Sequence, residues 1–208
     1  MGMNEDELVW YASYGSNCSA TRFRAYLTGT RADGAQRGER GARDSTPPSA
    51  SEPHWFPHPV RFLGDSSKWG GGGVAFLDHT PSSASPGRRY LITKGQFDDV
   101  AAQESRRELR PLEIDKLKTG VVSNLGDGFY DGLLLLPAID GVPVLTFTSP
   151  IPLDDRPTNA PSPAYLGTIV RGLAEVHEAE AATIAEWTLR SPGVAAGWTT
   201  EEIVKLLK

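Results

Sequence analysis

The sequence has little of several features that mark particular protein classes. A single cysteine among 208 residues excludes an intrachain disulfide, so we expect none of the disulfide frameworks of small secreted domains. A net charge of -5 argues against a general nucleic-acid-binding protein, because such proteins usually carry a basic surface. No apolar run approaches the length of about 20 residues that a membrane-spanning helix needs, and the acidic start has no signal-peptide pattern. We therefore expect a cytoplasmic protein without nucleic-acid or membrane partners.

Metal-binding and phosphate-binding motifs are also lacking. His54, His58 and His79 have a spacing that fits no standard zinc site, and the only cysteine, Cys18, is distant in sequence. The glycine run at residues 70–73 is not followed by Lys-Ser or Lys-Thr, so it is no P-loop, and it is no dinucleotide-binding fingerprint. We expect no metal and no cofactor.

The length fits one domain over residues 1–208, which is large enough to bury a core. Residues 29–53 are polar, rich in Arg, Gly and Pro and nearly free of apolar side chains, which predicts a long, mobile loop. The arginines of this loop also allow a nucleic-acid-binding tail, although acidic residues dilute their charge. Residues 175–208 are expected to form a C-terminal helical extension.

Strand-like and helix-like segments are mixed along the chain, which indicates an α/β (α+β) fold. Strands are expected over residues 8–14, 55–63, 68–77, 89–93, 128–136 and 142–148. Helices are expected over residues 20–27, 96–107, 112–117, 163–173, 178–189 and 199–207. Asp140-Gly141 predicts a hairpin turn. Pro143 favours an outer position in the sheet for the strand that follows, because proline cannot donate to a central ladder.

The most informative stretch is the apolar, aromatic run that begins at Val9 and ends in the turn Gly15-Ser16-Asn17. Val, Trp and Tyr favour a strand, Gly15 permits a tight turn with positive φ, and Asn17 or Ser19 can cap the helix that follows. A strand-turn-helix unit leaves backbone N–H groups unpaired at the helix start, where they can bind a carboxylate or an oxyanion. The same residues also fit an ordinary turn.

Glu104 is the second informative residue. Phe97, Val100, Ala101 and Glu104 have the spacing i, i+3, i+4 and i+7, which puts them on one face of a helix. A carboxylate in line with an apolar stripe faces the core, and a buried carboxylate can be tuned to move protons near neutral pH. The alternative is a solvated Glu104 at the rim, and the pattern does not decide between the two.

Several motifs, taken together and in this order, resemble the γ-glutamylcyclotransferase-like superfamily. They are Tyr14-Gly15-Ser16-Asn17 after the first strand, a Gly-Gly-x-Ala-type strand within residues 69–76, Gln103-Glu104 at a helix end, Gly128-Phe129-Tyr130, and residues 161–166 at the start of the late helix. More narrowly, the chain is similar to an actinobacterial-type, mostly uncharacterised branch. The resemblance covers most of Val9 to Leu173.

This resemblance implies a small mixed, barrel-like β-sheet flanked by helices, with the ligand at one mouth. It also implies a bacterial-type, cofactor-independent enzyme that cleaves a γ-glutamyl amide into 5-oxoproline and a free amine. Its partner would be a small-molecule γ-glutamyl substrate, and the enzyme would be a monomer or a homodimer. Glu104 would be the general acid/base. The substrate-binding residues would be Tyr14, Gly15, Ser16, Asn17, Gly73 and Tyr130.

The chain departs from the family pattern at several positions. Cys18 stands where an apolar residue usually follows the tetrapeptide, the 29–53 loop is longer than usual, and residues 105–108 replace a Gly-rich continuation. Phe147 stands where some members have Tyr. These differences leave the leaving amine open. Two other functions also remain open: a non-catalytic γ-glutamyl-binding module, and a different acyl-transfer enzyme that uses Cys18 as its nucleophile.

Overall fold

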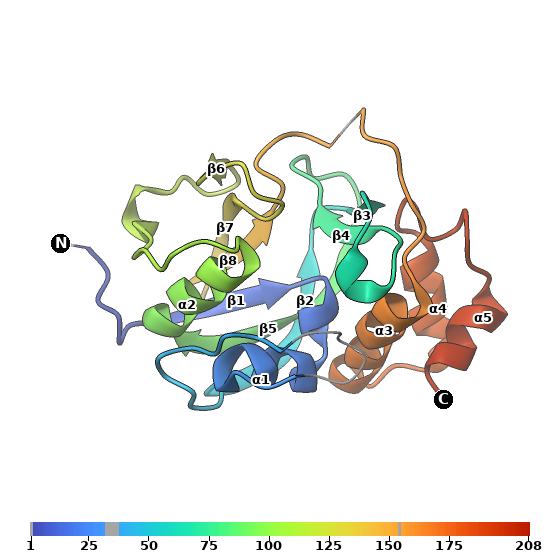
Figure 1. Ribbon diagram of the computed structural model, residues 1–208, viewed down its shortest axis with the longest axis horizontal. Helices are drawn as coiled ribbons and strands as arrows, with labels where there is room; N and C mark the ends of the chain where they lie inside the picture. The colour runs from blue at the N-terminus through green and yellow to red at the C-terminus, as the bar shows by residue number, and fades with distance from the viewer. Residues whose placement is uncertain (1, 32–37, 154) are drawn as a thin grey trace.

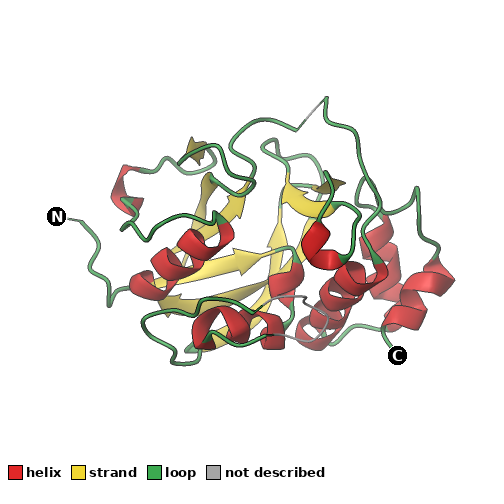
Figure 2. Ribbon diagram, viewed as in Figure 1, coloured by secondary structure: helices red, strands yellow, loops and turns green. Residues whose placement is uncertain are grey.

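Two β-sheets form the centre of the structure and helices cover them (Figures 1 and 2). The computed structural model describes residues 2–31, 38–153 and 155–208. The strands are β1 (Leu8–Ser13), β2 (Ala50–Phe56), β3 (Val60–Leu63), β4 (Val74–Leu77), β5 (Ser85–Thr93), β6 (Val122–Asn124), β7 (Gly132–Ile139) and β8 (Val142–Thr148). The α-helices are α1 (Ala20–Thr28), α2 (Lys94–Glu104), α3 (Pro163–His177), α4 (Ala181–Leu189) and α5 (Thr200–Leu206). The short 3₁₀ helices are η1 (Ser16–Cys18), η2 (Ser67–Trp69) and η3 (Ile114–Lys116).

The larger sheet has six strands in the order β2-β5-β1-β8-β7-β6, and β3 and β4 form a separate two-stranded sheet. β1 and β8 pair in parallel, while the other neighbours pair antiparallel, so the predicted mixed sheet is confirmed. Within the described residues the strand pairings leave β2 and β6 as edges. The large sheet is therefore open, and the expected barrel-like character does not extend to a closed barrel.

β1 shows how the alternation of side chains along a strand builds two cores. Val9 and Tyr11 pack with the apolar residues of α1 and α2, while Trp10 and Ala12 belong to a second cluster that includes β3, β4 and α3. Successive strand residues point to opposite faces of a sheet, so one strand in the middle of the sheet contributes to both clusters. This position places the end of β1 between the two helical layers.

α3 begins as predicted, with Ser162 as N-cap and Pro163 in the first turn. It then packs directly on the turn after β1. A Cβ atom at Gly172 would lie 2.3 Å from the backbone carbon of Cys18 and from the backbone nitrogen of Ser19. Only glycine allows this approach. α4 and α5 pack around α3 near the C-terminus (Figure 1).

The predicted 29–53 loop is wrong at its C-terminal end, because residues 50–56 form β2. This strand pairs with β5 from Ala50↔Leu91 to Phe56↔Ser85. β2 is an edge strand with alternating half-buried and exposed residues, and polar side chains and Pro53 are compatible with such a position. The expected single strand 55–63 is two strands in different sheets, with Pro57 and Pro59 between them. Residues 32–37 of the predicted loop lie outside the described residues.

The outer position expected for the last strand is also wrong, because β8 lies between β1 and β7. The pairing with β1 begins at Trp10↔Val144, one residue after Pro143. On the β7 side, the register shifts between Leu136 and Ile139, opposite this proline. Pro143 therefore stands where the regular ladder has not yet begun, and it does not restrict the strand to an edge. The hairpin turn at Asp140-Gly141 is confirmed, with positive φ at both residues.

Candidate active site

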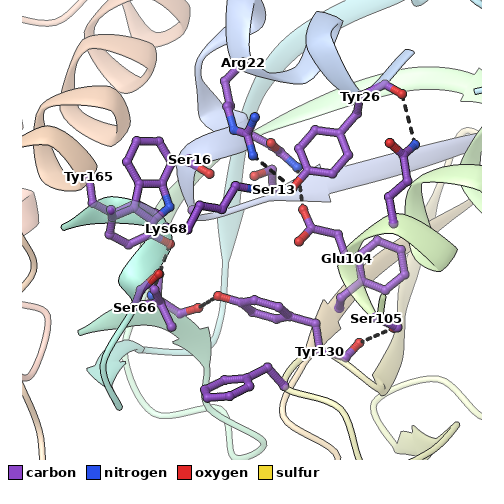
Figure 3. A pocket seen from close by; sticks show the side chains of 18 of the residues that line it. Ser13, Ser16, Arg22, Tyr26, Ser66, Lys68, Glu104, Ser105, Tyr130 and Tyr165 are labelled. Carbon is purple, nitrogen blue, oxygen red and sulfur yellow. Dashed lines mark hydrogen bonds between the residues drawn. The ribbon is translucent and has the colours of Figure 1, made fainter. Parts of the chain in front are cut away.

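A cavity of about 410 Å³ opens beside the end of β1 (Figure 3). Its wall combines the turn after β1, α1, η2, β4, the end of α2, the turn before β7, β8 and α3. Segments that are far apart in sequence therefore meet here. Of the seven predicted site residues, the lining includes Tyr14, Gly15, Ser16, Asn17, Glu104 and Tyr130.

The turn after β1 is held by close packing. The Tyr14 hydroxyl donates a hydrogen bond to the Phe147 carbonyl at 2.5 Å, which ties the turn to β8. Gly15 has φ -107°, so the positive φ expected there is wrong. A Cβ atom here would lie 3.2 Å from the Tyr165 hydroxyl of α3, so a larger residue would require that hydroxyl to shift slightly.

Asn17 and Glu104 meet inside the cavity. The buried Asn17 side chain donates from Nδ2 to the Glu104 carboxylate at 3.0 Å and to the Tyr11 hydroxyl at 3.1 Å. Glu104 is the last residue of α2 and is half-buried. Its exposure is therefore intermediate between the buried and the solvated side chain that the sequence allowed. The amide of Asn17 can thus orient one carboxylate oxygen while the carboxylate faces the cavity.

The neighbouring Gln103 has a structural task. Its Nε2 donates to the Tyr26 carbonyl at 3.0 Å, and its Oε1 accepts from the Gly41 amide at 3.1 Å. These bonds join the end of α2 to α1 and to the segment that follows residue 37. Gln103 therefore fixes the helix end from which Glu104 extends.

Four further tyrosine side chains line the cavity, which are Tyr11, Tyr26, Tyr130 and Tyr165. Burial raises the pKa of all four, and for Tyr11 and Tyr26 the charge of Glu104 raises the pKa further. For Tyr165 the raised pKa is about 12. These hydroxyls therefore stay protonated at neutral pH and can donate hydrogen bonds.

Tyr130 and Tyr165 also hold the wall formed by β4. The Tyr130 hydroxyl donates to the Ala75 carbonyl at 2.8 Å, and the Tyr165 hydroxyl accepts from the Ala75 amide at 3.2 Å. The Tyr130 ring stacks on Phe76 with a centroid distance of 5.0 Å. A ligand in the cavity would meet aromatic side chains whose positions are already set (Figure 3).

A charged part of the wall was not anticipated from the sequence. Arg22 of α1 is only 2% exposed, its Nη2 donates to the Tyr26 hydroxyl at 3.2 Å, and it forms an ion pair with Glu39 at 2.5 Å. Lys68 of η2 pairs with the same Glu39 oxygen at 2.8 Å. The available signal was an arginine four residues before Tyr26, since this spacing places Arg22 on the buried face of the predicted helix. Nothing in the sequence pattern pointed to Glu39.

The structure places Gly73 away from the cavity. Gly73 is not among the described residues that line it, and its amide donates to the Ala160 carbonyl at 2.9 Å. A Cβ atom there would lie 2.2 Å from the Asn159 carbonyl oxygen, so glycine is required by the passing backbone. Its predicted substrate contact is therefore not supported.

Cys18 does not have the surroundings of a nucleophile. It is fully buried, its thiol donates to the Ser13 carbonyl at 3.3 Å, and it is not among the described lining residues. Burial raises the pKa of this thiol to about 12, so the reactive thiolate is disfavoured. The acyl-transfer alternative based on Cys18 loses its basis.

The described part of the chain contains neither a clustered metal-ligand set nor a membrane-spanning helix. Residues 2–31, 38–153 and 155–208 contain no group of three or more His, Cys, Asp or Glu side chains placed to hold a metal ion. The described helices include none with the length and apolar character needed to cross a membrane.

Comparison with solved structures identifies the fold. The chain superposes on gamma-glutamyl cyclotransferase with a TM-score of 0.55 and 16% identity, covering 97% of this chain and 98% of that one. An uncharacterized protein from Homo sapiens matches with the same TM-score and identity over 96% of this chain and 99% of its own. The fold expected from the sequence motifs is therefore confirmed. No family model matches the sequence.

One curated protein matches in sequence. Histone deacetylase 5 of Arabidopsis thaliana is 31% identical in an alignment of 185 residues that covers 80% of this chain. The chain spans only 28% of the length of that relative. The name describes a protein most of which lies outside the matched part.

Proposed function

We propose that this chain cleaves a γ-glutamyl amide by cyclisation, releasing 5-oxoproline and a free amine, with Glu104 as general acid and base. The observation that carries the proposal is the 3.0 Å hydrogen bond between Asn17 and Glu104 inside a cavity of about 410 Å³. This pair joins two of the motifs that resemble the γ-glutamylcyclotransferase-like superfamily. The shared fold with gamma-glutamyl cyclotransferase supports the same activity.

The reaction needs little covalent chemistry from the protein. The α-amine of the glutamyl group attacks its own γ-carbonyl carbon, a new C–N bond closes the lactam, and the bond to the leaving nitrogen breaks. Overall, the α-ammonium group loses two protons, and the leaving nitrogen gains two as it becomes an ammonium ion. Because the nucleophile is part of the substrate, the protein mainly has to hold the glutamyl chain bent.

Glu104 is suited to the proton transfers. Its carboxylate would remove the two protons from the α-nitrogen one after the other and pass each of them to the leaving nitrogen. Asn17 would keep one carboxylate oxygen in place through Nδ2, while the other oxygen stays free for the substrate. A positioned general acid/base typically contributes about 10²–10⁴-fold to the rate.

The oxyanion that forms at the γ-carbonyl would need hydrogen-bond donors. Ser16 and Asn17 lie in the first turn of η1, where backbone N–H groups have no partner within the helix, and both residues line the cavity. The protonated Tyr11 hydroxyl is a further donor in this wall. Fixed donors of this kind stabilise developing negative charge without reorganisation.

The test is turnover of a panel of γ-glutamyl amines and γ-glutamyl dipeptides by wild type and by Glu104→Gln, with 5-oxoproline detected by mass spectrometry. The variant should lose about 10²–10⁴-fold in kcat, because glutamine cannot exchange the proton. Glu186→Gln is the matched control, since Glu186 is 66% exposed on α4 and pairs with Arg190. The control should retain wild-type turnover.

Three results would reject the enzymatic proposal. Formation of 5-oxoproline by Glu104→Gln at the wild-type rate would remove Glu104 from the mechanism. If wild type forms no product with any substrate but 5-oxoproline raises its melting temperature, the chain is a γ-glutamyl-binding module without turnover. If wild type neither forms 5-oxoproline nor binds it, the chain shares the fold but does not have this function.

A further inference from the structure

Arg22 has hydrogen-bonding capacity that the protein leaves unused. Its Nη2 is occupied by Tyr26 and Glu39, but Nε and Nη1 are buried and have no hydrogen-bond partner among the described residues. Buried polar groups are nearly always paired, because an unpaired donor loses its hydration without compensation. Arg22 lines the cavity, so a ligand there can supply the missing acceptors once the groups that cover these two nitrogens shift.

Aromatic side chains hold the guanidinium group in place. Its central carbon lies 4.7 Å from the centre of the Tyr26 ring and 5.7 Å from the centre of the Trp69 ring. These contacts fix the orientation of the planar group and keep water away from its faces. Lys68 extends toward the same place from η2 (Figure 3), and its side chain is 25% exposed.

Glu39 approaches this pair of cations from outside the cavity. It is absent from the described cavity lining and belongs instead to a neighbouring pocket beside Gln103 and Arg106. Its side chain is 10% exposed, and one oxygen accepts from both Arg22 and Lys68. The group of three carries two positive charges and one negative charge, so the group has a net positive charge, and the negative charge of Glu104 in the same cavity also acts on Arg22.

We propose that Arg22 and Lys68 form a subsite for a carboxylate on the leaving group of the substrate, and that Glu39 acts as a fixed counter-ion that limits how tightly this carboxylate binds. This proposal rests on the proposed function, which makes the ligand a γ-glutamyl amide. The subsite selects an amine that carries one negative charge over a neutral amine. Neutralising Glu39 strengthens that selection, because the repulsion between Glu39 and the ligand carboxylate disappears.

The test compares γ-glutamylglycine with γ-glutamylmethylamide, two ligands that differ only in this carboxylate. Dissociation constants are measured by calorimetry in the Glu104→Gln background, so that turnover does not interfere. We expect γ-glutamylglycine to bind about tenfold more tightly, as for a charge-assisted contact to arginine. Adding Arg22→Gln should bring the ratio close to one by weakening γ-glutamylglycine alone.

Glu39→Gln, in the same background, should raise the ratio by about fivefold, because a neighbouring negative charge is removed while the side-chain shape is kept. Glu186→Gln, which neutralises an exposed carboxylate on α4, should leave the ratio unchanged. Because Arg22 is buried, its variant can fail to fold. Lys68→Gln then serves in its place, since Lys68 is partly exposed, and it should lower the ratio severalfold.

The subsite would be overturned if the ratio of the two dissociation constants stayed unchanged in Glu39→Gln and also in Arg22→Gln or Lys68→Gln. An equal loss of affinity for both ligands in Arg22→Gln would assign Arg22 to the α-carboxylate that both ligands share, which also rejects the proposal.

N-acetylglycine, which has the carboxylate but no glutamyl group, separates this inference from the proposed function. If wild type forms no 5-oxoproline but binds N-acetylglycine through Arg22, the subsite stands and the cyclisation fails. If wild type converts both γ-glutamyl ligands with equal kcat/KM, the cyclisation stands and the subsite fails.

Discussion

The two sides of the cavity are built in different ways. On one side, the turn after β1 is held by neutral hydrogen-bond donors: Tyr14 donates to the Phe147 carbonyl and Asn17 donates to Glu104. The helix α3 packs against this turn. On the other side, Arg22, Lys68 and Glu39 are joined mainly by their charges. The first side matches the family motifs and the second does not. If the proposed function holds, the first side would hold the glutamyl group and the second would select the leaving group.

The largest expected effect is on the rigid side, from Gly172→Val. A valine there would put side-chain atoms into the backbone of Cys18 and Ser19, so α3 would have to move away from η1. We expect a loss of about 3 kcal/mol in the free energy of unfolding, measured by urea denaturation. Gly120→Val is a control for the general cost of replacing glycine, because nothing lies within 4 Å of its Cβ position, although its φ of +76° adds backbone strain. A smaller loss for Gly172→Val than for this control would contradict the packing argument.

Asn17→Ala should have the next largest effect, and mainly on catalysis. It removes the donor that holds Glu104 and the Tyr11 hydroxyl, so the carboxylate loses its orientation. We expect kcat for 5-oxoproline formation to fall by about 10–100-fold, with a smaller change in KM. Asn124→Ala removes the exposed amide of the last residue of β6 and should leave kcat unchanged. A wild-type kcat in Asn17→Ala would show that Glu104 needs no such support.

The smallest effect is expected on the charged side, in the response of stability to acid. Burial opposes ionisation of Glu39, but Arg22 and Lys68 outweigh it, so the pKa of Glu39 is lowered below its ordinary value of 4.5. A lowered pKa in the folded state stabilises the protein above pH 4.5, and this contribution is lost as the pH falls through the folded value. Glu39→Gln should therefore cost about 1 kcal/mol at pH 7.

Urea denaturation of both proteins between pH 7 and pH 3 tests this sign. The difference between wild type and Glu39→Gln should shrink toward acidic pH and should not grow. A constant difference over the whole range would mean that the side-chain shape of Glu39, and not its charge, stabilises the wall. Lower stability together with tighter carboxylate binding in Glu39→Gln would indicate that this residue stabilises the fold at the expense of ligand affinity.

Local patterns predicted the elements that depend on residues only a few positions apart in the sequence. The capping residue Ser162, the capping box at Thr199 and the hairpin at Asp140 all lie where the sequence indicated. The strand before Tyr14 was predicted from its run of Val, Trp and Tyr residues, and the helix that ends at Glu104 was predicted from the regular spacing of its apolar residues. The predictions were wrong where a neighbour distant in sequence decides the environment, as for β2 on β5 and β8 beside β1.

For the site, the sequence by itself determined which groups are available: a turn with a free amide side chain at Asn17 and a carboxylate at the end of a helix. Only the tertiary structure decided that these groups meet at 3.0 Å, that Gly73 is needed for space, and that Cys18 is buried. It also brought together Arg22, Glu39 and Lys68, which come from three separate segments. The physical reason is that propensity and capping act over a few residues of chain. Burial and ion pairing act across space, and therefore depend on the complete fold.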